Sequence, residues 1–233
     1  MHAPVSQLVP VPLLLTAYRS GIFPMADSRE DEDLFWIEPR ERAVIPLDKF
    51  RLSRSLAKLL RQDRFRVTCN AAFGAVIEAC AQPRPDHPET WISHRIENSY
   101  RALHEAGHAH SLECWQGNEL VGGLYGVSFD RAFCGESMFS RVPNASKIAL
   151  AWLVALMRRC EFRLLDCQFM TDHLASLGAR EIARDSYLML LAHAGARAPR
   201  CDLPEGYAEV SSLVSAGASS PGKLIAQSLT QTS

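Results

Sequence analysis

Apolar residues recur at helical spacing in the first half of the chain. Four leucines fall at positions i, i+4, i+7 and i+8, which places them on one face of a helix; they are Leu52, Leu56, Leu59 and Leu60. This spacing predicts an amphipathic helix over residues 50–62. Shorter patterns predict helices over Val11–Tyr18, Ala71–Ala81 and Ser93–Glu105, and strands over Ala43–Pro46 and Phe65–Thr68.

The period changes after residue 108, where three apolar runs favour extended structure. They cover Ala109–Trp115, Leu120–Phe129 and Ala132–Phe139. The pairs Gly117-Asn118 and Asp130-Arg131 separate them and are typical of tight turns. The sequence therefore predicts an antiparallel three-strand meander.

The rest of the chain alternates between helical and extended patterns. We predict a long helix over Ala145–Cys160 with Asn144 as its N-cap, a strand over Leu164–Phe169, and helices over Asp172–Leu177 and Arg184–His193. The polar, small-residue composition after Asp202 predicts a flexible tail over residues 206–233. The element order predicts an α+β fold, a mixed sheet covered by helices, which resembles GNAT acyltransferases.

Bulk composition narrows the class of protein further. The chain has 233 residues, 47% hydrophobic and 22% charged, which suits a globular domain with a small companion. The formal net charge is −1, so affinity for nucleic acid needs a local basic patch. The run Leu8–Leu15 is too short to span a bilayer, contains two prolines and follows no basic segment. We therefore expect a cytoplasmic protein with no membrane partner.

The seven cysteines form no recognisable pattern. Their number is odd and no two have CxxC spacing, which argues against a disulfide framework and a zinc ribbon. Several lie in apolar runs, where cysteine packs as a small hydrophobic residue. We expect buried thiols in a reducing compartment.

A basic stripe accompanies the leucine helix. Residues 49–66 contain seven basic residues and a single acid, Asp63, a local net charge of +6. Arg54, Lys58 and Arg61 lie opposite the leucines. Such a stripe is either an ordinary solvated helix face or a track for a phosphate backbone.

Three polar residues interrupt apolar strands. Asp166 and Gln168 are two residues apart, so both side chains should leave the same face of their strand. Burying them requires partners, and they form either a functional site or a satisfied pair that fixes the register. Glu136, in another apolar strand, should meet a cation, either an internal arginine or a ligand.

The segment His104-Glu105-Ala106-Gly107-His108 matches the HExxH zinc motif, which needs both histidines on one helix face. Gly107 falls where the helix should end, so His108 is expected beyond it. A helix-end turn is the favoured interpretation, and we expect no metal.

The glycine-rich run Gly122–Gly126 lies within the meander, where it suits close backbone approach or room for a ligand along the strand, rather than a phosphate cradle. An acyltransferase that uses coenzyme A would carry a glycine loop before its long helix. Residues 140–147 contain no glycine there. This argues against acetyl-CoA as the donor.

Eight runs of residues, in order, together resemble the leucyl/phenylalanyl-tRNA–protein transferases. They are YRSGIFPM (18–25), TWIS (90–93), LHEAGHAHSLECW (103–115), LVGGLYGV (120–127), FCGESMFS (133–140), NASKIAL (144–150), LDCQ (165–168) and HLASLGAREI (173–182). The resemblance implies a small N-terminal domain at 1–41 and a GNAT-like catalytic domain at 42–205.

The resemblance also implies an activity and its partners. Such an enzyme moves Leu or Phe, and Met less well, from aminoacyl-tRNA to proteins with an N-terminal Arg or Lys. The product N-terminus marks the acceptor protein for degradation. No cofactor is needed, and a monomer is expected. The rival interpretations are an acyltransferase that uses coenzyme A and an RNA-binding module without transfer activity.

The family's site residues map onto this sequence by motif. Asp166 and Gln168 match the catalytic pair, and Glu136 matches the glutamate of the GES run. The residues implied for substrate binding are Trp91, Leu124, Phe133, Leu153, Ser137 and Met138. Those implied for tRNA binding are Arg54, Lys58 and Arg61.

Two departures from the family pattern concern the N-terminal domain. The LAxGGDL run that usually precedes the YxxGxFP motif is absent, so we expect a shortened domain. Met25 stands where many relatives have tryptophan.

Overall fold

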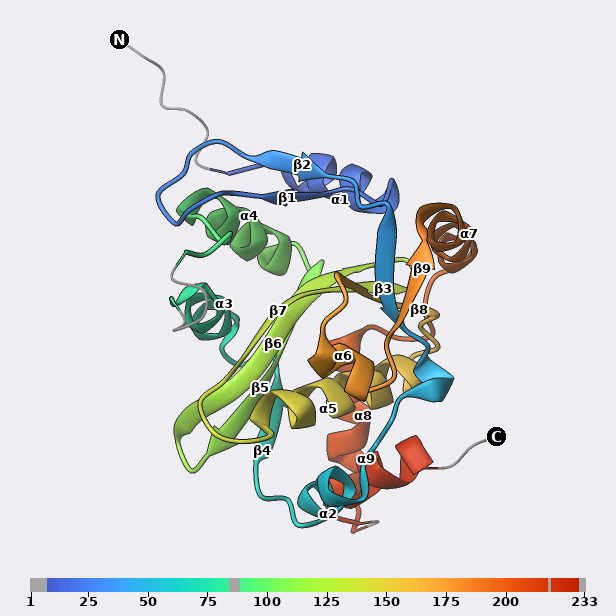
Figure 1. Cartoon of the computed structure of the whole chain (residues 1–233). Helices are drawn as coiled ribbons and strands as arrows, with labels where there is room; N and C mark the ends of the chain where they lie inside the picture. The colour runs from blue at the N-terminus through green and yellow to red at the C-terminus, as the bar shows by residue number, and fades with distance from the viewer. Residues whose placement is uncertain (1–7, 84–88, 218, 231–233) are drawn as a thin grey trace.

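A seven-stranded mixed sheet forms the centre of the molecule (Figure 1). The computed structural model describes residues 8–83, 89–217 and 219–230. The strand order is β4-β5-β6-β7-β8-β3-β9, and only β7 and β8 run parallel. The strands are β3 (Glu41–Ile45), β4 (Arg66–Cys69), β5 (Ala109–Gln116), β6 (Glu119–Phe129), β7 (Ala132–Ser140), β8 (Leu164–Gln168) and β9 (Arg180–Ala183).

Helices cover both faces of this sheet. They are α1 (Val11–Arg19), α2 (Arg54–Arg61), α3 (Phe73–Ala81), α4 (His94–Glu105), α5 (Ala145–Arg159), α6 (Asp172–Ser176), α7 (Arg184–Gly195), α8 (Leu203–Ser215) and α9 (Pro221–Thr230). No helix in the described segments has both the length and the apolar character that a bilayer crossing requires.

Alternation along β6 separates two hydrophobic cores. Leu124 belongs to the core that contains α5, whereas its neighbour Tyr125 belongs to the core that contains α3 and α4. Helix α5 is buried along nearly its whole length because α2, α8 and α9 pack outside it. The fold is thus α+β with a mixed sheet, as predicted.

Strands β7 and β8 are paired over only three residues. Residues 132–134 of β7 face residues 164–166 of β8, and β7 then continues to Ser140 paired with β6 but not with β8. The two strands therefore part in mid-sheet, which makes room for a cavity between their ends.

A small N-terminal unit lies over α4 (Figure 1). It consists of α1 and a separate two-stranded sheet of β1 (Phe23–Met25) and β2 (Phe35–Ile37). Leu14, Tyr18 and Phe23 are buried in the same core as Ile96 and Tyr100 of α4. The N-terminal unit therefore shares its core with the larger domain.

Most predicted elements are confirmed by the structure, since their signals are local. The meander has its turns at the predicted places, because Gln116 faces Glu119 and Phe129 faces Ala132. Ser93 caps α4, accepting a hydrogen bond from the backbone N–H of Ile96 at 3.3 Å.

Some boundaries differ from the predictions. Helix α2 begins only at Arg54, because the Ser53 hydroxyl accepts a bond from the Leu56 N–H and caps the helix there. Asn144 does not cap α5 with its side chain; its backbone is left-handed, with φ 71°. Strands β9 and β1 were not predicted. Strand β1 contains Pro24, a residue that is rare inside strands.

The prediction of a flexible tail over residues 206–233 was wrong for the residues that the structure describes. Helices α8 and α9 occupy most of this segment and pack on α5. Asp202 and Glu205 form a capping box at the start of α8. Leu203 and Ile225 are buried, so sparse apolar positions anchor a composition that is otherwise polar and small.

The cysteine prediction also needs a correction. Cys160 at the end of α5 and Cys201 before α8 form a disulfide across 41 residues of sequence. The sequence prediction relied on closely spaced cysteine pairs. It could not detect this disulfide, because the two cysteines are far apart in the sequence. The other five cysteines are free, and three of them are buried as expected.

Candidate active site

A cavity of about 650 Å³ lies where β7 and β8 part. Its walls come from the two diverging strands, the first half of α5, helix α6, and Met25 and Trp91 on the side of the N-terminal unit. A volume of this size suits a small molecule or the end of a larger one.

One wall of the cavity is apolar and uncharged. It is formed by Leu124, Met138, Leu150, Leu153 and Leu165, which belong to or pack against the core around α5. Among the described lining residues, Glu136 is the only carboxylate.

Glu136 occupies a β-bulge in β7. Tyr125 faces Ser137 and the next residue of β6, Gly126, faces Gly135, so Glu136 is the extra residue. A bulge locally redirects a side chain and stops regular pairing. The sheet therefore turns the Glu136 carboxylate toward the junction of β7, β8 and the N-terminal unit.

Three donors hold this carboxylate, although only 8% of Glu136 is exposed. Its Oε1 accepts hydrogen bonds from the Tyr18 hydroxyl at 2.8 Å and from Gln168 Nε2 at 2.9 Å. Its Oε2 accepts one from the Tyr100 hydroxyl at 3.0 Å. The two tyrosine hydroxyl oxygens also lie within hydrogen-bonding distance of one another, so two hydroxyl hydrogens are shared among three contacts. Neutral donors therefore take the place of the internal arginine that the sequence offered as one alternative, and a cationic ligand stays a prediction.

Burial raises the pKa of Glu136 to about 7, because the surrounding core disfavours a charge. The hydrogen bonds from Tyr18, Gln168 and Tyr100 act in the opposite direction, and the nearby charge of Asp166 adds to the rise. A carboxylate with a pKa near 7 can accept a proton and release it at physiological pH.

Gln168 ends strand β8 in an unusual backbone conformation. Its φ is 61°, in the left-handed region that side chains other than glycine rarely adopt. Its N–H donates to Asp166 Oδ1 at 2.8 Å, an Asx-type turn that supports this conformation. Gln168 still belongs to β8 and faces Ala43, and both it and Asp166 are buried, whereas Cys167 between them is half-buried. That the side chains of Asp166 and Gln168 leave the same face of the strand stays a prediction.

Asp166 is fully buried and paired with Arg42. The guanidinium donates from Nε to Oδ1 at 3.0 Å and from Nη2 to Oδ2 at 2.5 Å. It lies between the rings of Phe23 and Tyr187, at 4.7 and 4.6 Å from their centroids. The Tyr187 hydroxyl also donates to Asp166 Oδ2 at 3.0 Å.

This ion pair has consequences for Arg42 and for the cavity. Burial alone would lower the pKa of Arg42, but the charge and hydrogen bonds of Asp166 raise it overall. Asp166 is not among the residues that line the cavity. Its contact with the site is therefore indirect: it accepts the backbone N–H of Gln168, which does line the cavity.

The structure brings together most of the predicted site residues. Those that line the cavity are Glu136, Gln168, Trp91, Leu124, Leu153, Ser137 and Met138. Phe133 does not line it and is fully buried in the core around α5, where its ring packs over Gly126. The roles assigned to all these residues stay predictions.

Sequence reasoning missed Tyr18, Tyr100, Arg42 and Tyr187. Tyr18 lies in the YRSGIFPM run, so a signal existed but gave no role. Arg42 precedes the apolar residues 43–45, and a buried carboxylate such as Asp166 requires a cation. Because the two residues are 124 positions apart, nothing local connects them.

Trp91 is fixed to the N-terminal unit by backbone contacts. The Ala26 N–H donates to the Trp91 carbonyl at 3.2 Å, and Arg29 Nη1 donates to the Ile92 carbonyl at 2.8 Å. Loop residues 26–29 therefore hold this wall of the cavity in place.

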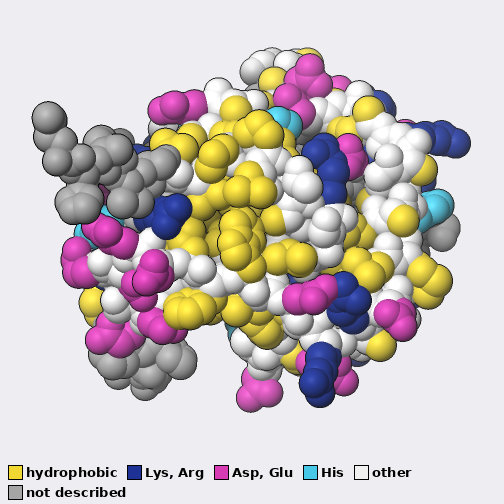
Figure 2. Space-filling model, turned by 90° about the horizontal axis from the view of Figure 1, so that it is seen from above, with side chains coloured by type: hydrophobic (Ala, Val, Ile, Leu, Met, Phe, Trp, Pro, Cys, Tyr) yellow, Lys and Arg dark blue, Asp and Glu magenta, His cyan; other side chains and the backbone are white. Residues whose placement is uncertain are grey.

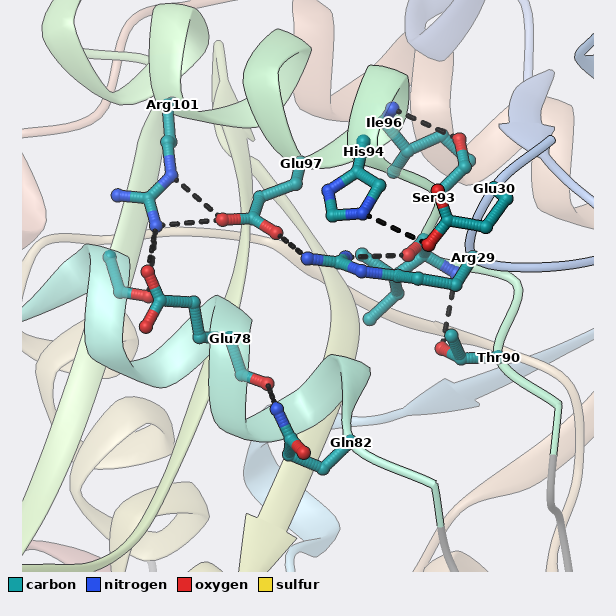
Figure 3. A network of polar contacts seen from close by, with 12 residues as sticks. Arg29, Glu30, Glu78, Gln82, Thr90, Ser93, His94, Ile96, Glu97 and Arg101 are labelled. Carbon is teal, nitrogen blue, oxygen red and sulfur yellow. Dashed lines mark hydrogen bonds and ion pairs between the residues drawn. The ribbon is translucent and has the colours of Figure 1, made fainter. Parts of the chain in front are cut away.

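An ionic network anchors the same loop to two helices (Figure 3). Arg29 pairs with Glu97 of α4, and Arg101 joins Glu97 to Glu78 of α3. Burial alone would raise the pKa of Glu97, but the hydrogen bonds and charges of the two arginines lower it overall.

The surface beside the cavity is apolar. Phe35 and Trp36 of β2 are exposed, at 48% and 43%. Phe35 faces Met25 across the β1–β2 pair, so both side chains leave the same face, and Met25 lines the cavity. Figure 2, which views this end of the molecule, shows hydrophobic side chains gathered on it.

The HExxH match does not form a metal-binding helix face. Helix α4 ends at Glu105, and Gly107 adopts φ 80°, so His108 lies beyond the helix as predicted. His104 Nδ1 lies 2.8 Å from the Ala109 carbonyl and its ring stacks on Phe73. Both contacts belong to the turn between α4 and β5.

The basic residues of α2 lie outside the cavity. Arg54, Lys58 and Arg61 are exposed, and within the described segments none of them has an ion-pair partner. Leu56, Ala57 and Leu60 are buried on the other side of the helix, which confirms the amphipathic pattern.

Comparison with known proteins places the chain in a family. Residues 44–192 match the family described as leucyl/phenylalanyl-tRNA protein transferase, and residues 9–40 match its N-terminal domain. A protein of Novosphingobium aromaticivorans named leucyl/phenylalanyl-tRNA–protein transferase is 56% identical over 97% of this chain and 97% of its own length. Proteins with that name from Rhizorhabdus wittichii and Zymomonas mobilis are 62% and 60% identical over 77% of this chain, covering 72% and 67% of their lengths.

These matches identify the class of protein as an aminoacyltransferase, built on a mixed sheet with a small N-terminal domain. The chain belongs to the leucyl/phenylalanyl-tRNA–protein transferase family. Helices α8 and α9 lie beyond the residues that match the family description, which end at 192.

Proposed function

We propose that this enzyme transfers Leu or Phe, and Met less well, from aminoacyl-tRNA to the α-amine of proteins that begin with Arg or Lys. The observation that carries the proposal is a cavity with an uncharged apolar wall beside a buried, hydrogen-bonded carboxylate. The apolar wall suits the donor side chain, and the carboxylate suits the acceptor amine. The new N-terminal residue marks the acceptor for degradation in the cytoplasm.

The donor side chain fits against the leucine wall. Leu150 and Leu153 of α5 and Leu124 of β6 present branched aliphatic side chains, whereas Met138 contributes a flexible, unbranched one. Methionine adapts its shape to different neighbours, which helps one pocket accept both Leu and Phe. A charged donor side chain would lose its hydration here without finding a partner.

The terminal adenosine of the tRNA fits the opposite wall. Trp91 and Met25 line the cavity there, and Phe35 extends the apolar surface outward. Aromatic side chains stack on nucleobases and contribute about 1–3 kcal/mol per base. The ester bond of the donor then lies between the two walls, beside Glu136 and Gln168.

The reaction converts an ester into an amide. The acceptor nitrogen forms a bond to the ester carbonyl carbon, and the bond from that carbon to the ribose oxygen breaks. The amine loses a proton, and the ribose oxygen takes one up and leaves as a hydroxyl. An α-amine has a pKa of about 7.7–8.0, so part of it is already neutral at pH 7. The protein must therefore position the amine and take up the proton.

Glu136 is suited to accept that proton. Its pKa of about 7 lies close to that of the amine, which favours proton exchange near neutral pH. Gln168 gives its amide N–H to Glu136, so its amide oxygen can accept a hydrogen bond from the incoming amine. A carboxamide is a very weak base, and we assign it positioning rather than proton uptake.

Asp166 supports the conformation of Gln168 and does not itself line the cavity. It accepts the Gln168 backbone N–H and is held by Arg42 and Tyr187, which supports the left-handed conformation of Gln168. We assign Asp166 and Arg42 as positioning residues. Asp166 is not among the described residues that line the cavity, which argues against direct contact with the amine.

The tRNA body fits the basic face of α2. Three exposed cations on an eight-residue helix can contact successive phosphates without reading base sequence. Binding of this kind weakens as the salt concentration rises, because it depends on the release of counterions.

The direct test is transfer of radiolabelled Leu from charged tRNA to two peptides that differ only in an N-terminal Arg or Ala. We expect label on the Arg peptide alone, and loss of label with Glu136→Gln. The matched control is Glu119→Gln, an exposed carboxylate at the start of β6, which should keep full transfer. Equal label on both peptides would contradict the acceptor rule, and no label on either would contradict transfer itself.

A further inference from the structure

The C-terminal helices α8 and α9 lie outside both segments that match the family, yet α9 packs on the helix proposed to bind tRNA. The family match ends at residue 192, and α9 covers residues 221–230. Helix α9 packs against α2 and α5, whereas α8 packs against α5 and β4 (Figure 1). The contact between α9 and α2 therefore bears on tRNA binding.

The apolar face of α2 is buried together with that of α9. Leu56 and Leu60 of α2 belong to the same hydrophobic cluster as Ile225 and Leu229 of α9, and all four are at least 90% buried. Helix α2 has only eight residues, and isolated helices of that length are not stable in water. Its conformation therefore depends on the elements that cover its apolar face.

The first turn of α9 fits closely against the end of α2. The Gly222 N–H donates to Asp63 Oδ1 at 2.6 Å, and Asp63 follows α2 with a left-handed φ of 47°. A Cβ on Gly222 would collide with the Leu60 carbonyl oxygen, so only glycine permits this approach. Contacts this close leave α2 little freedom to move.

The other end of α9 is fixed by Arg158 of α5. Arg158 Nη1 donates to the Ser228 carbonyl at 3.0 Å, and its Nε donates to the Leu47 carbonyl at 2.7 Å. Leu47 lies in the turn that leads into α2. Arg158 therefore links α9 to the segment that precedes α2, and Gly222 links α9 to Asp63, which follows α2.

We infer that α9 is a brace that positions Arg54, Lys58 and Arg61 on α2 for the phosphates of the tRNA body. The inference rests on the proposed function of α2. With α9 in place, the three cations lie opposite the buried leucines and face solvent together. The brace acts on affinity for the tRNA body and leaves the chemistry at Glu136 unchanged.

The experiment compares two donors that share the ester and the terminal adenosine. One is Leu-tRNA, and the other is leucyl-adenosine, which lacks the tRNA body. In Gly222→Ala we expect the Michaelis constant for Leu-tRNA to rise about tenfold, as expected when phosphate contacts weaken. The Michaelis constant for leucyl-adenosine, and kcat with either donor, should stay unchanged. Gln227→Ala, on the exposed side of α9, should change neither.

A second variant keeps the test valid if Gly222→Ala fails to fold. Ile225→Ala leaves the backbone approach intact and removes only part of the apolar contact, so it should give a smaller rise with Leu-tRNA alone. Circular dichroism would show that each variant remains folded. A Michaelis constant for Leu-tRNA that stays the same in folded variants would overturn the brace. Equal losses with both donors would also overturn it, because α9 would then support the whole catalytic domain.

Arg54→Glu in the full chain separates this inference from the proposed function. If Arg54→Glu raises the Michaelis constant for Leu-tRNA while Gly222→Ala does not, α2 binds tRNA and the brace is wrong. If Arg54→Glu has no effect either, the proposed tRNA face itself is wrong.

Discussion

Gln168 donates its amide hydrogen to Glu136 over 2.9 Å, and the two residues come from strands that have already parted. The carboxylate is thereby held by an amide that is itself fixed by the left-handed end of β8. Because each residue positions the other, removing either should disturb both. The first predictions concern this pair.

The rate of transfer should depend on the protonation of Glu136. Its pKa is about 7, so the carboxylate form that we propose as the proton acceptor is present above pH 7 and is lost as the pH falls below it. We expect kcat to rise with pH between about 6 and 8. Glu136→Gln should lower kcat by about 100-fold or more and abolish the rise near pH 7. Single-turnover rates across this pH range would show it.

Tyr18→Phe provides the control for that assignment. The Tyr18 hydroxyl lowers the pKa of Glu136, so its loss should move the rise in kcat to higher pH. Tyr125→Phe removes a hydroxyl that has no hydrogen-bond partner within the described residues, and it should not move the curve. A Tyr18→Phe curve at the wild-type position would count against Glu136 as the titrating group.

Glu136 should also reduce stability at neutral pH. Its pKa is raised in the folded protein, so its contribution to stability is full below about pH 4.3 and is lost as the pH rises through 7. Relative to the wild type, Glu136→Gln should gain up to about 3 kcal/mol between about pH 4 and pH 8. Urea unfolding at several pH values would measure this difference. Glu119→Gln, on the surface, should show no such trend.

The sequence predicts those features of this protein that depend on local spacing, and it misses those that depend on contacts between distant residues. The leucines of α2 predict a helix because their spacing is a local signal. The bulge at Glu136 depends on how β6 and β7 pair, and no local pattern encodes that register. Helix α9 was not predicted because it has few apolar residues, and these are buried only through packing against distant residues such as those of α2.

The ion pair between Arg42 and Asp166 should be important for stability. Arg42→Met leaves a buried carboxylate without its cation, and we expect a loss of about 3–5 kcal/mol. Arg42→Lys should recover only part of this, because lysine lacks the two-pronged contact and the flat face between Phe23 and Tyr187. Denaturant unfolding of both variants would test the order. Adding Asp166→Asn to Arg42→Met should restore part of the stability.

The basic face of α2 should control the salt dependence of tRNA binding. Replacing Arg54, Lys58 and Arg61 with glutamine should lower the slope of log K against log salt by about 2–3, if each contacts one phosphate. Arg163→Gln, exposed between α5 and β8, should leave the slope unchanged. Titrations of Leu-tRNA at several salt concentrations would give the slopes.

The disulfide between Cys160 and Cys201 should stabilise the protein when it is formed. It closes a segment of 41 residues, and a loop of this size contributes about 2–4 kcal/mol. Cys201→Ser should lose this amount under oxidising conditions and match the wild type in a reducing buffer. Cys69→Ser, a free thiol, should behave alike in both buffers. An equal loss in both buffers would indicate that only packing is involved.

The position of β3 in the sheet has a consequence for synthesis of the chain. β3 is made early, yet both of its neighbours, β8 and β9, are made late. A nascent chain that ends before residue 164 carries β3 with two open edges and Arg42 without Asp166, which lies 124 residues further on. The closed sheet and the positioned Gln168 therefore require residues 164–183 to have been made, and we expect chains that end before them to have no transfer activity.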